Sequence, residues 1–206
     1  MKARSQNLKK LLADKKIAPL VKKFGEPNLS DRKGTRGMFE ALLRSIIHQQ
    51  LAGAAARTIH ARFLVLFPRK KPTPELVLAK SDSELRSVGL SAMKVSYVKD
   101  LALKFKENTV PYRKFKTMKS DEIVEHLTKI RGVGEWTVHM FLIFTLNRED
   151  ILPVGDLAIR KSFEKVYGLK KTPTRRDMER LAEPWREQAS LVSWYFWRLA
   201  DELKKK

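Results

Sequence analysis

The chain has 206 residues, enough to bury the core of one large domain or of two smaller ones. Lysine and arginine total 43 against 23 acidic residues, and the resulting formal net charge of +20 favours a polyanionic partner such as nucleic acid over a solubilising lysine coat or a membrane surface. Because the sequence has no cysteine, it excludes disulfides, thiolate zinc sites and a cysteine-ligated iron–sulfur cluster.

Residues 1–16, MKARSQNLKKLLADKK, lack the apolar core of a signal peptide. No stretch of the chain approaches the roughly 20 consecutive apolar residues needed to cross a bilayer. We therefore expect a soluble intracellular protein with no membrane contact, cytoplasmic and nucleoid-associated if its source is bacterial.

Apolar residues recur at three- and four-residue spacing along nearly the whole chain, and strict alternation is scarce, so the sequence predicts an all-α fold. The pattern breaks at residues 25–37 and again at 147–156. We expect residues 37–149 to form a middle helical subdomain, and residues 1–36 and 150–206 to form a second, terminal one. A cleft between two such subdomains is a natural ligand site.

Local signals place several helix boundaries in the middle subdomain. The apolar pattern predicts helices over Met38–Gln50 and Ala52–Phe67. Ser81 with Glu84 predicts a capping box at the start of another helix, and Ser120 precedes a further one.

Residues 121–146, DEIVEHLTKIRGVGEWTVHMFLIFTL, predict two helices joined by a tight turn at Gly132, Val133 and Gly134. In such a helix-hairpin-helix, the amides that begin the second helix can bind a DNA phosphate without reading any base. The same Gly-x-Gly turn is also an ordinary connector between helices, so spacing alone leaves both interpretations open.

Asp156 opens a predicted helix, DLAIRKSFEKVYG, where it is a natural N-cap. A helix N-terminus also stabilises an ionised carboxylate, which can stabilise positive charge that develops during a reaction. Capping and catalysis are compatible at this position.

Four segments together resemble the helix-hairpin-helix DNA glycosylase superfamily, in particular the bacterial 3-methyladenine DNA glycosylase II family. The segments are MFEALLRSIIHQQLAGAAARTI, LRSVGLSAMKVSYVKDLA, LTKIRGVGEWTVHMF and LPVGDLAIRKSF, which occur in the family's order within residues 37–200. The resemblance implies two helical subdomains with an active-site cleft between them. It also implies a monofunctional enzyme of base excision repair that binds double-stranded DNA as a monomer, flips alkylated purines such as 3-methyladenine or 7-methylguanine, and excises them hydrolytically to leave an abasic site.

By the same resemblance, Asp156 is the catalytic aspartate. Trp136 stands where lyase-competent relatives carry a nucleophilic lysine, so water should be the nucleophile, and Trp136 should line the base pocket. Trp185 resembles a pocket tryptophan of the family, and Met140 stands at a pocket position where the family often has an aromatic residue, so the pocket should differ from that of the best-known members. For both tryptophans the alternative is a packed core aromatic.

Leu51 matches the family's apolar wedge, which enters the stack that a flipped base vacates, and Gln50 is placed to contact the partner base or the minor groove. A buried core leucine is the alternative for Leu51. The four histidines show no metal-ligand pattern, so no catalytic cofactor is expected. The family holds a monovalent cation, sodium or potassium, in its hairpin, and here the backbone carbonyls of Thr128, Ile130 and Val133 would bind it.

Two other functions fit part of the pattern. A non-catalytic helix-hairpin-helix DNA-binding module would explain the glycines and the charge, but not Asp156, Trp136 and Leu51 together. A bifunctional glycosylase/lyase for oxidised bases would need a lysine at the position of Trp136.

Overall fold

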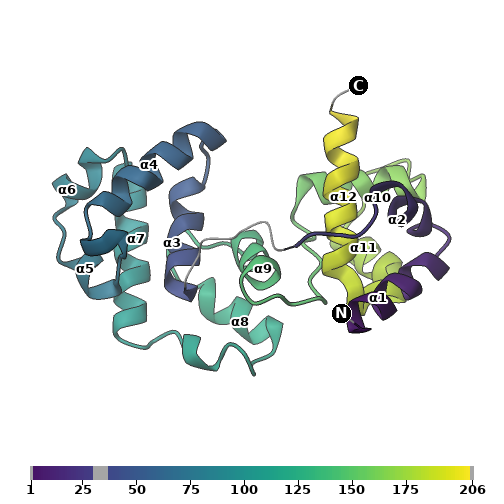
Figure 1. Ribbon diagram of the computed structural model, residues 1–206, viewed down its shortest axis with the longest axis horizontal. Coiled ribbons are helices and arrows are strands. Elements are labelled where there is room, and N and C mark those ends of the chain that lie inside the picture. The colour runs from purple at the N-terminus through teal and green to yellow at the C-terminus, as the bar shows by residue number, and fades with distance from the viewer. Residues whose placement is uncertain (1, 30–36, 205–206) are drawn as a thin grey trace. The chain divides into compact units, whose positions relative to one another are not determined.

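The computed structural model describes residues 2–29 and 37–204, with side chains from residue 7 onwards. Residues 30–36, most of the predicted loop at 25–37, lie outside the described residues. Within the described ranges the secondary structure is entirely helical, as the sequence predicts (Figure 1). In the described part of the chain, none of the helices combines the length and hydropathy that a membrane span requires.

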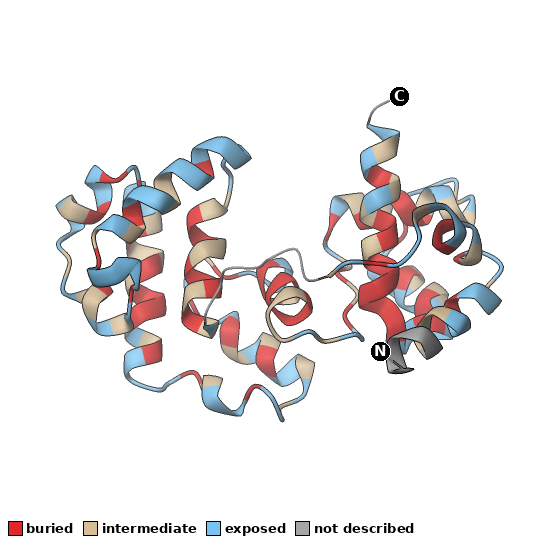
Figure 2. Ribbon diagram, viewed as in Figure 1, coloured by how far each residue is buried: buried red, intermediate tan, exposed pale blue. Residues whose placement is uncertain are grey.

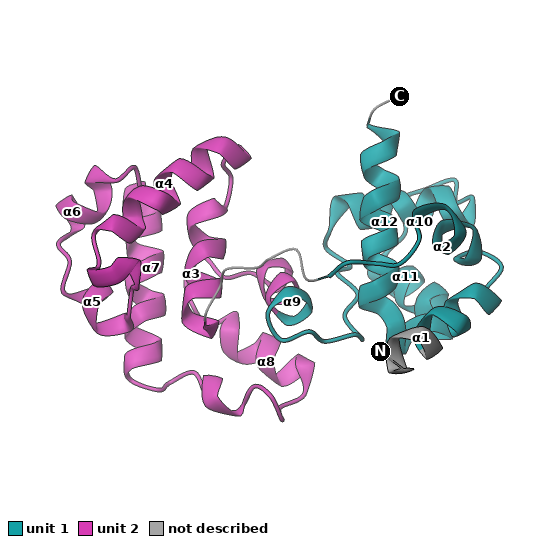
Figure 3. Ribbon diagram, viewed as in Figure 1, with its two compact units in different colours: residues 1–33, 142–206 teal, residues 34–141 magenta. Residues whose placement is uncertain are grey.

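The chain divides into two compact units (Figure 3). The terminal unit contains residues 1–33 and 142–206, and the middle unit contains residues 34–141. The second boundary falls inside helix α9 (Glu135–Phe144), whereas the sequence placed it after this helix, at residue 149. Helix α9 continues through this boundary, so the helical apolar pattern of the sequence shows no break there.

Helix α12 is the centre of the terminal unit, and Figure 2 shows buried residues running along it. It packs against α10 and α2, and an aromatic cluster of Phe163, Trp185 and Phe196 fills the space between the helices. The helices of this unit are α1 (Lys2–Ala13), α2 (Ala18–Phe24), α10 (Leu157–Tyr167), α11 (Arg175–Ala182), the 3-10 helix η3 (Glu183–Gln188) and α12 (Ala189–Leu203).

Helix α7 is the centre of the middle unit, where it packs against α3, α5 and α6. Its buried side, with Val95, Val98 and Leu101, supplies apolar contacts along much of its length. The helices of this unit, with the shared α9, are α3 (Met38–His48), α4 (Gly53–Val65), η1 (Pro68–Lys70), α5 (Pro74–Leu78), α6 (Asp82–Ser87), α7 (Ala92–Lys106), η2 (Tyr112–Lys114), α8 (Ser120–Leu127) and α9 (Glu135–Phe144).

The predicted helix boundaries are correct to within two residues. The capping box of Ser81 and Glu84 is confirmed at the start of α6. Helix α3 ends at His48, before the predicted Gln50, because the backbone leaves the helical region there and Gln50 has a φ of 55°. Ser120 is the first residue of α8 rather than its cap, since the backbone N–H of Lys119 donates to the Glu122 carboxylate at 2.9 Å.

Candidate active site

Asp156 is the N-cap of α10, as the sequence predicts. Its Oδ1 accepts hydrogen bonds from the backbone N–H groups of Ala158 at 2.8 Å and Ile159 at 3.1 Å. The side chain is 9% exposed. The N-terminal amides and the helix dipole therefore hold a carboxylate in one orientation and stabilise negative charge at this point.

A second oxygen of the same carboxylate is held by Trp197, which the sequence analysis missed. The indole Nε1 of Trp197, on α12, donates to Asp156 Oδ2 at 3.3 Å. Its ring stacks on Phe144 with a centroid separation of 5.7 Å. Two helices therefore fix the orientation of Asp156 from two sides, through a contact between residues 41 positions apart.

Trp136 and Met140 lie one turn apart on α9 and differ in exposure. Trp136, in the first turn, is 46% exposed, an unusual position for an indole that only fills a core. Met140 is buried at 3% exposure. Trp136 is therefore partly exposed, and the pocket roles of Trp136 and Met140 both stay predictions.

Trp185 belongs to the core of the terminal unit, so the structure favours the alternative that the sequence left open for it. Its side chain is 1% exposed and packs on Phe163 and Phe196. The indole N–H donates to the Tyr167 hydroxyl at 3.1 Å. Both the ring and its donor are satisfied within the core, which favours the core interpretation, and a pocket role of Trp185 stays a prediction.

The predicted hairpin is present between α8 and α9, and its two glycines serve different purposes. Gly132 has a φ of +78°, and a Cβ placed there would lie 2.1 Å from the Tyr97 ring, so the turn requires glycine. Gly134 has no such constraint, because a Cβ there meets nothing within 4 Å. The space beside Gly134, at the start of α9, is therefore open to a ligand.

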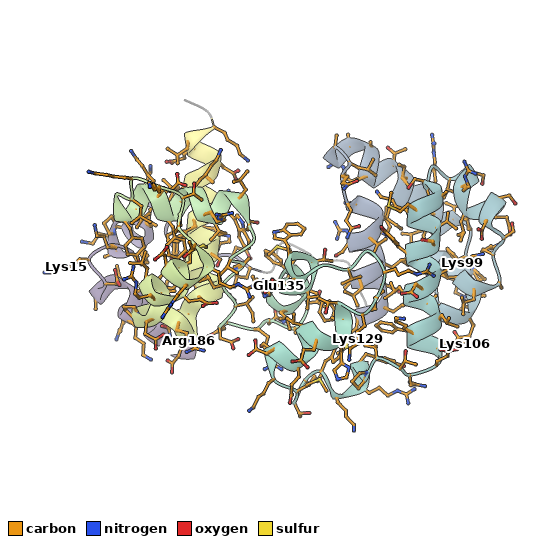
Figure 4. All side chains as sticks on the ribbon, turned by 180° about the vertical axis from the view of Figure 1, so that it is seen from behind. Lys15, Lys99, Lys106, Lys129, Glu135 and Arg186 are labelled. Atoms are coloured by element: carbon orange, nitrogen blue, oxygen red, sulfur yellow. The ribbon has the colours of Figure 1, made fainter. Side chains whose placement is uncertain are left out.

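Exposed basic side chains surround this turn. Lys129 and Arg131 are both exposed in the segment that precedes Gly132, and Figure 4 labels Lys129 together with Glu135 at the start of α9. Positive charge next to the N-terminus of a helix is an arrangement that favours a phosphate.

The backbone of the hairpin also offers carbonyl oxygens that could bind a cation. Thr128, Ile130 and Val133 lie in the non-helical segment between α8 and α9, and the Ile130 carbonyl accepts the Val133 N–H at 3.0 Å. Carbonyl oxygens suit a hard monovalent cation. In the ranges that the structure describes, no group of three or more histidine, aspartate or glutamate side chains is arranged to hold a metal ion.

Gln50 and Leu51 form the tip of the loop between α3 and α4. Gln50 adopts a left-handed φ of 55°, and Leu51 is 37% exposed. A large apolar side chain held in solvent at a strained turn is not a core leucine, which favours the wedge interpretation.

The middle unit therefore brings the hairpin and the exposed loop together, because the side chain of Gln49 donates to the Gly132 carbonyl at 2.8 Å. The terminal unit supplies a rigidly held carboxylate. A helix-hairpin-helix followed by such an aspartate defines a class of base excision DNA repair protein.

The comparisons with known proteins assign the family. The model of the HhH-GPD superfamily base excision DNA repair proteins matches residues 43–187. The chain belongs to this superfamily. The resemblance inferred from the motifs and the expected all-α glycosylase fold are both confirmed.

Three matches, one to a sequence and two to solved structures, support the assignment. The chain is 33% identical to DNA-3-methyladenine glycosylase 1 of Schizosaccharomyces pombe, over 92% of this chain and 84% of the relative. The structure of the Schizosaccharomyces pombe 3-methyladenine DNA glycosylase (Mag1) in complex with abasic DNA matches with a TM-score of 0.82 and 30% identity, over 95% of this chain and 97% of that one. The DNA-3-methyladenine glycosidase of Bacillus halodurans matches with a TM-score of 0.87 and 26% identity, over 97% and 91% of the two chains.

Proposed function

We propose that this protein is a monofunctional DNA glycosylase that acts as a monomer on double-stranded DNA, flips alkylated purines and hydrolyses their glycosidic bond. The favoured substrate is 3-methyladenine, with 7-methylguanine a weaker one. The observation that carries the proposal is the carboxylate of Asp156, which two backbone N–H groups and the Trp197 indole hold in place. The similarity to 3-methyladenine DNA glycosylases supports the substrate class.

The role of Asp156 is electrostatic. As the bond between C1′ and the base nitrogen breaks, its electron pair leaves with the base and positive charge develops on the deoxyribose. A carboxylate fixed in advance stabilises this charge without reorganising during the reaction. Water then adds to C1′ and loses a proton, which leaves an abasic site.

Trp136 determines which nucleophile is used. A lysine at this position could form a Schiff base with the deoxyribose, but an indole has no nucleophilic amine. The product strand should therefore stay intact. The exposed ring of Trp136 supplies a face on which a flipped base can stack.

The hairpin and the loop between α3 and α4 hold the DNA in this proposal. Amides at the start of α9, next to Gly134, bind a backbone phosphate, and Leu51 fills the gap that the flipped nucleotide leaves. Gln50 contacts the unpaired partner base or the minor groove. A monovalent cation held by the backbone carbonyls of the hairpin residues 128, 130 and 133 would add positive charge beside the phosphate.

The preference for alkylated purines follows from the chemistry of the leaving group. Methylation at N3 of adenine or N7 of guanine puts positive charge on the base and weakens its glycosidic bond. Asp156 acts as an ionised carboxylate in this proposal, and no other acid is assigned to protonate a neutral leaving base. A cationic base over the Trp136 indole gains roughly 0.5 to 2 kcal/mol, depending on desolvation.

Release of free bases from a methylated duplex tests the proposal, with strand integrity followed in parallel. We expect 3-methyladenine as the main product, an intact strand until alkali is added, and no release by Asp156→Asn. Cleaved strands would instead indicate a bifunctional lyase. DNA binding without base release by the wild-type protein would indicate a non-catalytic module.

A further inference from the structure

The loop at residues 49–52, here called the wedge loop, follows the end of α3, where carbonyl groups lose their helical partners. In a continuing helix, the carbonyls of Ile47 and Gln49 would accept N–H groups four residues further on. Instead, both accept hydrogen bonds from Lys94 Nζ, each at 2.7 Å. A single ammonium on α7 therefore closes the C-terminal end of α3, where the helix dipole favours positive charge.

The Lys94 ammonium is partly withdrawn from water. Burial lowers the pKa of Lys94 below the ordinary lysine value. The lowered pKa agrees with the two short hydrogen bonds from Lys94 Nζ to the Ile47 and Gln49 carbonyls, and these bonds establish the specific contact.

The wedge loop is also tied to the hairpin. The side-chain Nε2 of Gln49 donates to the Gly132 carbonyl at 2.8 Å and lies 3.4 Å from the Thr137 hydroxyl. This hydrogen bond joins residues 83 positions apart in the chain, one in the wedge loop and one in the hairpin, which are the two proposed DNA contacts.

Helix α7 anchors the hairpin with the residues that follow Lys94 at three-residue spacing. The Tyr97 ring lies directly against Gly132. The carboxylate of Asp100 accepts the backbone N–H of Arg131 at 2.8 Å, and Asp100 is itself 8% exposed. Residues three apart lie on one face of a helix, so a single face of α7 supports both the wedge loop and the hairpin.

We propose that Lys94 is a positioning residue that fixes the wedge loop relative to the hairpin. The hairpin can then bind a backbone phosphate while Leu51 inserts at a fixed distance along the same duplex. The proposal rests on the proposed function, because it assumes that both segments contact DNA. With its base held, the loop presents Leu51 and the strained Gln50 to the duplex in a preset conformation. Insertion then does not have to order the loop, and this entropy would otherwise be lost on binding.

The test measures the preference for damaged DNA, which is the ratio of two Kd values, rather than a single affinity. Fluorescence anisotropy gives the Kd for a duplex with a tetrahydrofuran abasic-site analogue, whose gap accepts the wedge, and the Kd for the same duplex undamaged. Lys94→Met removes the clamp and one positive charge. Lys99→Met is the matched control, because Lys99 lies on the same helix, is labelled in Figure 4 and pairs with Asp82 instead.

We expect both variants to weaken binding to undamaged DNA by a similar factor, since each removes one charge. The preference for the abasic duplex should fall about tenfold in Lys94→Met, the effect of losing hydrogen bonds to a charged group. In Lys99→Met it should stay at the wild-type level. If Lys94→Met and Lys99→Met show the same preference for the abasic over the undamaged duplex, the proposal is overturned.

A second variant keeps the test decisive if Lys94→Met does not fold, as judged by circular dichroism. Gln49→Ala cuts the link to Gly132 with no change in charge, and it should also reduce the preference for the abasic duplex. A folded Gln49→Ala protein with the wild-type preference would then refute the coupling. If the wild-type protein itself neither prefers the abasic duplex nor releases bases, the proposed function fails instead.

Discussion

Trp197→Phe should slow base excision about tenfold without weakening DNA binding. The substitution removes the indole N–H that donates to Asp156 Oδ2 at 3.3 Å and keeps an aromatic ring to pack on Phe144. A hydrogen bond to a charged group contributes about 1.5 to 3 kcal/mol, and a separation longer than the usual charge-assisted distance puts this one at the lower end. A loss of about 1.4 kcal/mol of transition-state stabilisation corresponds to a tenfold lower rate.

A double-mutant cycle separates this role from a general structural one. Single-turnover excision of 3-methyladenine is measured for the wild-type protein, Trp197→Phe, Asp156→Asn and the double variant. If Trp197 acts through the charge of Asp156, its replacement should change the residual rate of Asp156→Asn by less than about twofold. Tyr167→Phe is the matched control. It also removes the hydrogen-bond partner of an indole in the same core, the partly buried hydroxyl that accepts from Trp185, and it does not touch Asp156.

Two results would refute this reasoning. Equal losses from Trp197→Phe in the wild-type and Asp156→Asn backgrounds would show that Trp197 acts independently of the carboxylate. A loss in Tyr167→Phe as large as that in Trp197→Phe would show that the rate follows the integrity of the core.

The remaining predictions concern the catalytic charge, the nucleophile, the hairpin and the wedge. Asp156→Asn should lower the single-turnover rate by at least about 10²-fold with the affinity for DNA retained, and near-normal activity would contradict the assignment. Borohydride should trap no covalent adduct with DNA, because Trp136 provides no amine; efficient trapping would mean that another residue is the nucleophile. Gly134→Val should weaken binding to every duplex while the Tm stays unchanged. Gly132→Ala should lower the free energy of unfolding by roughly 1 to 3 kcal/mol, because Gly132 has a positive φ and its Cβ would meet the Tyr97 ring. A loss of stability in Gly134→Val with none in Gly132→Ala would contradict these roles. Leu51→Ala should impair excision from a stable base pair more than from a mismatch, and equal effects on both would support the buried-core alternative.

The parts of the fold that the sequence predicts correctly depend on local chemistry. The capping box of Ser81 and Glu84, the N-cap at Asp156 and the turn at Gly132 each involve residues within a few positions of one another. Such signals survive in any tertiary context, because the groups that they satisfy belong to the same helix end. The end of α3 differs from the prediction by two residues, because the backbone leaves the helical region after His48. The start of α8 differs by one, because Lys119 is its N-cap.

The aromatic residues of the carboxy-terminal segment show where local reasoning ends. Trp185 follows a proline at a helix start, which gives no indication of whether its ring is buried. Its hydrogen-bond partner, Tyr167, lies on another helix. Trp197 lies in an aromatic-rich helix, and only the packing of α12 against α10 brings its N–H to Asp156. The burial of Trp185 depends on how η3 packs against α10 and α12, and the contact of Trp197 depends on which face of α12 it occupies. The sequence specifies neither.

Asp156 illustrates why a structural and a catalytic role can share one side chain. Its Oδ1 is used by the cap, so two backbone amides of α10 determine where the carboxylate lies. Its Oδ2 receives the Trp197 N–H, so a second helix determines how it is turned. A carboxylate that is already oriented loses no conformational entropy when a cationic transition state forms beside it. The amides that cap the helix stabilise the negative charge of this carboxylate. In the proposed function, stability and catalysis therefore require the same geometry at this position, so the cap signal in the sequence and the catalytic role that the resemblance implies are compatible.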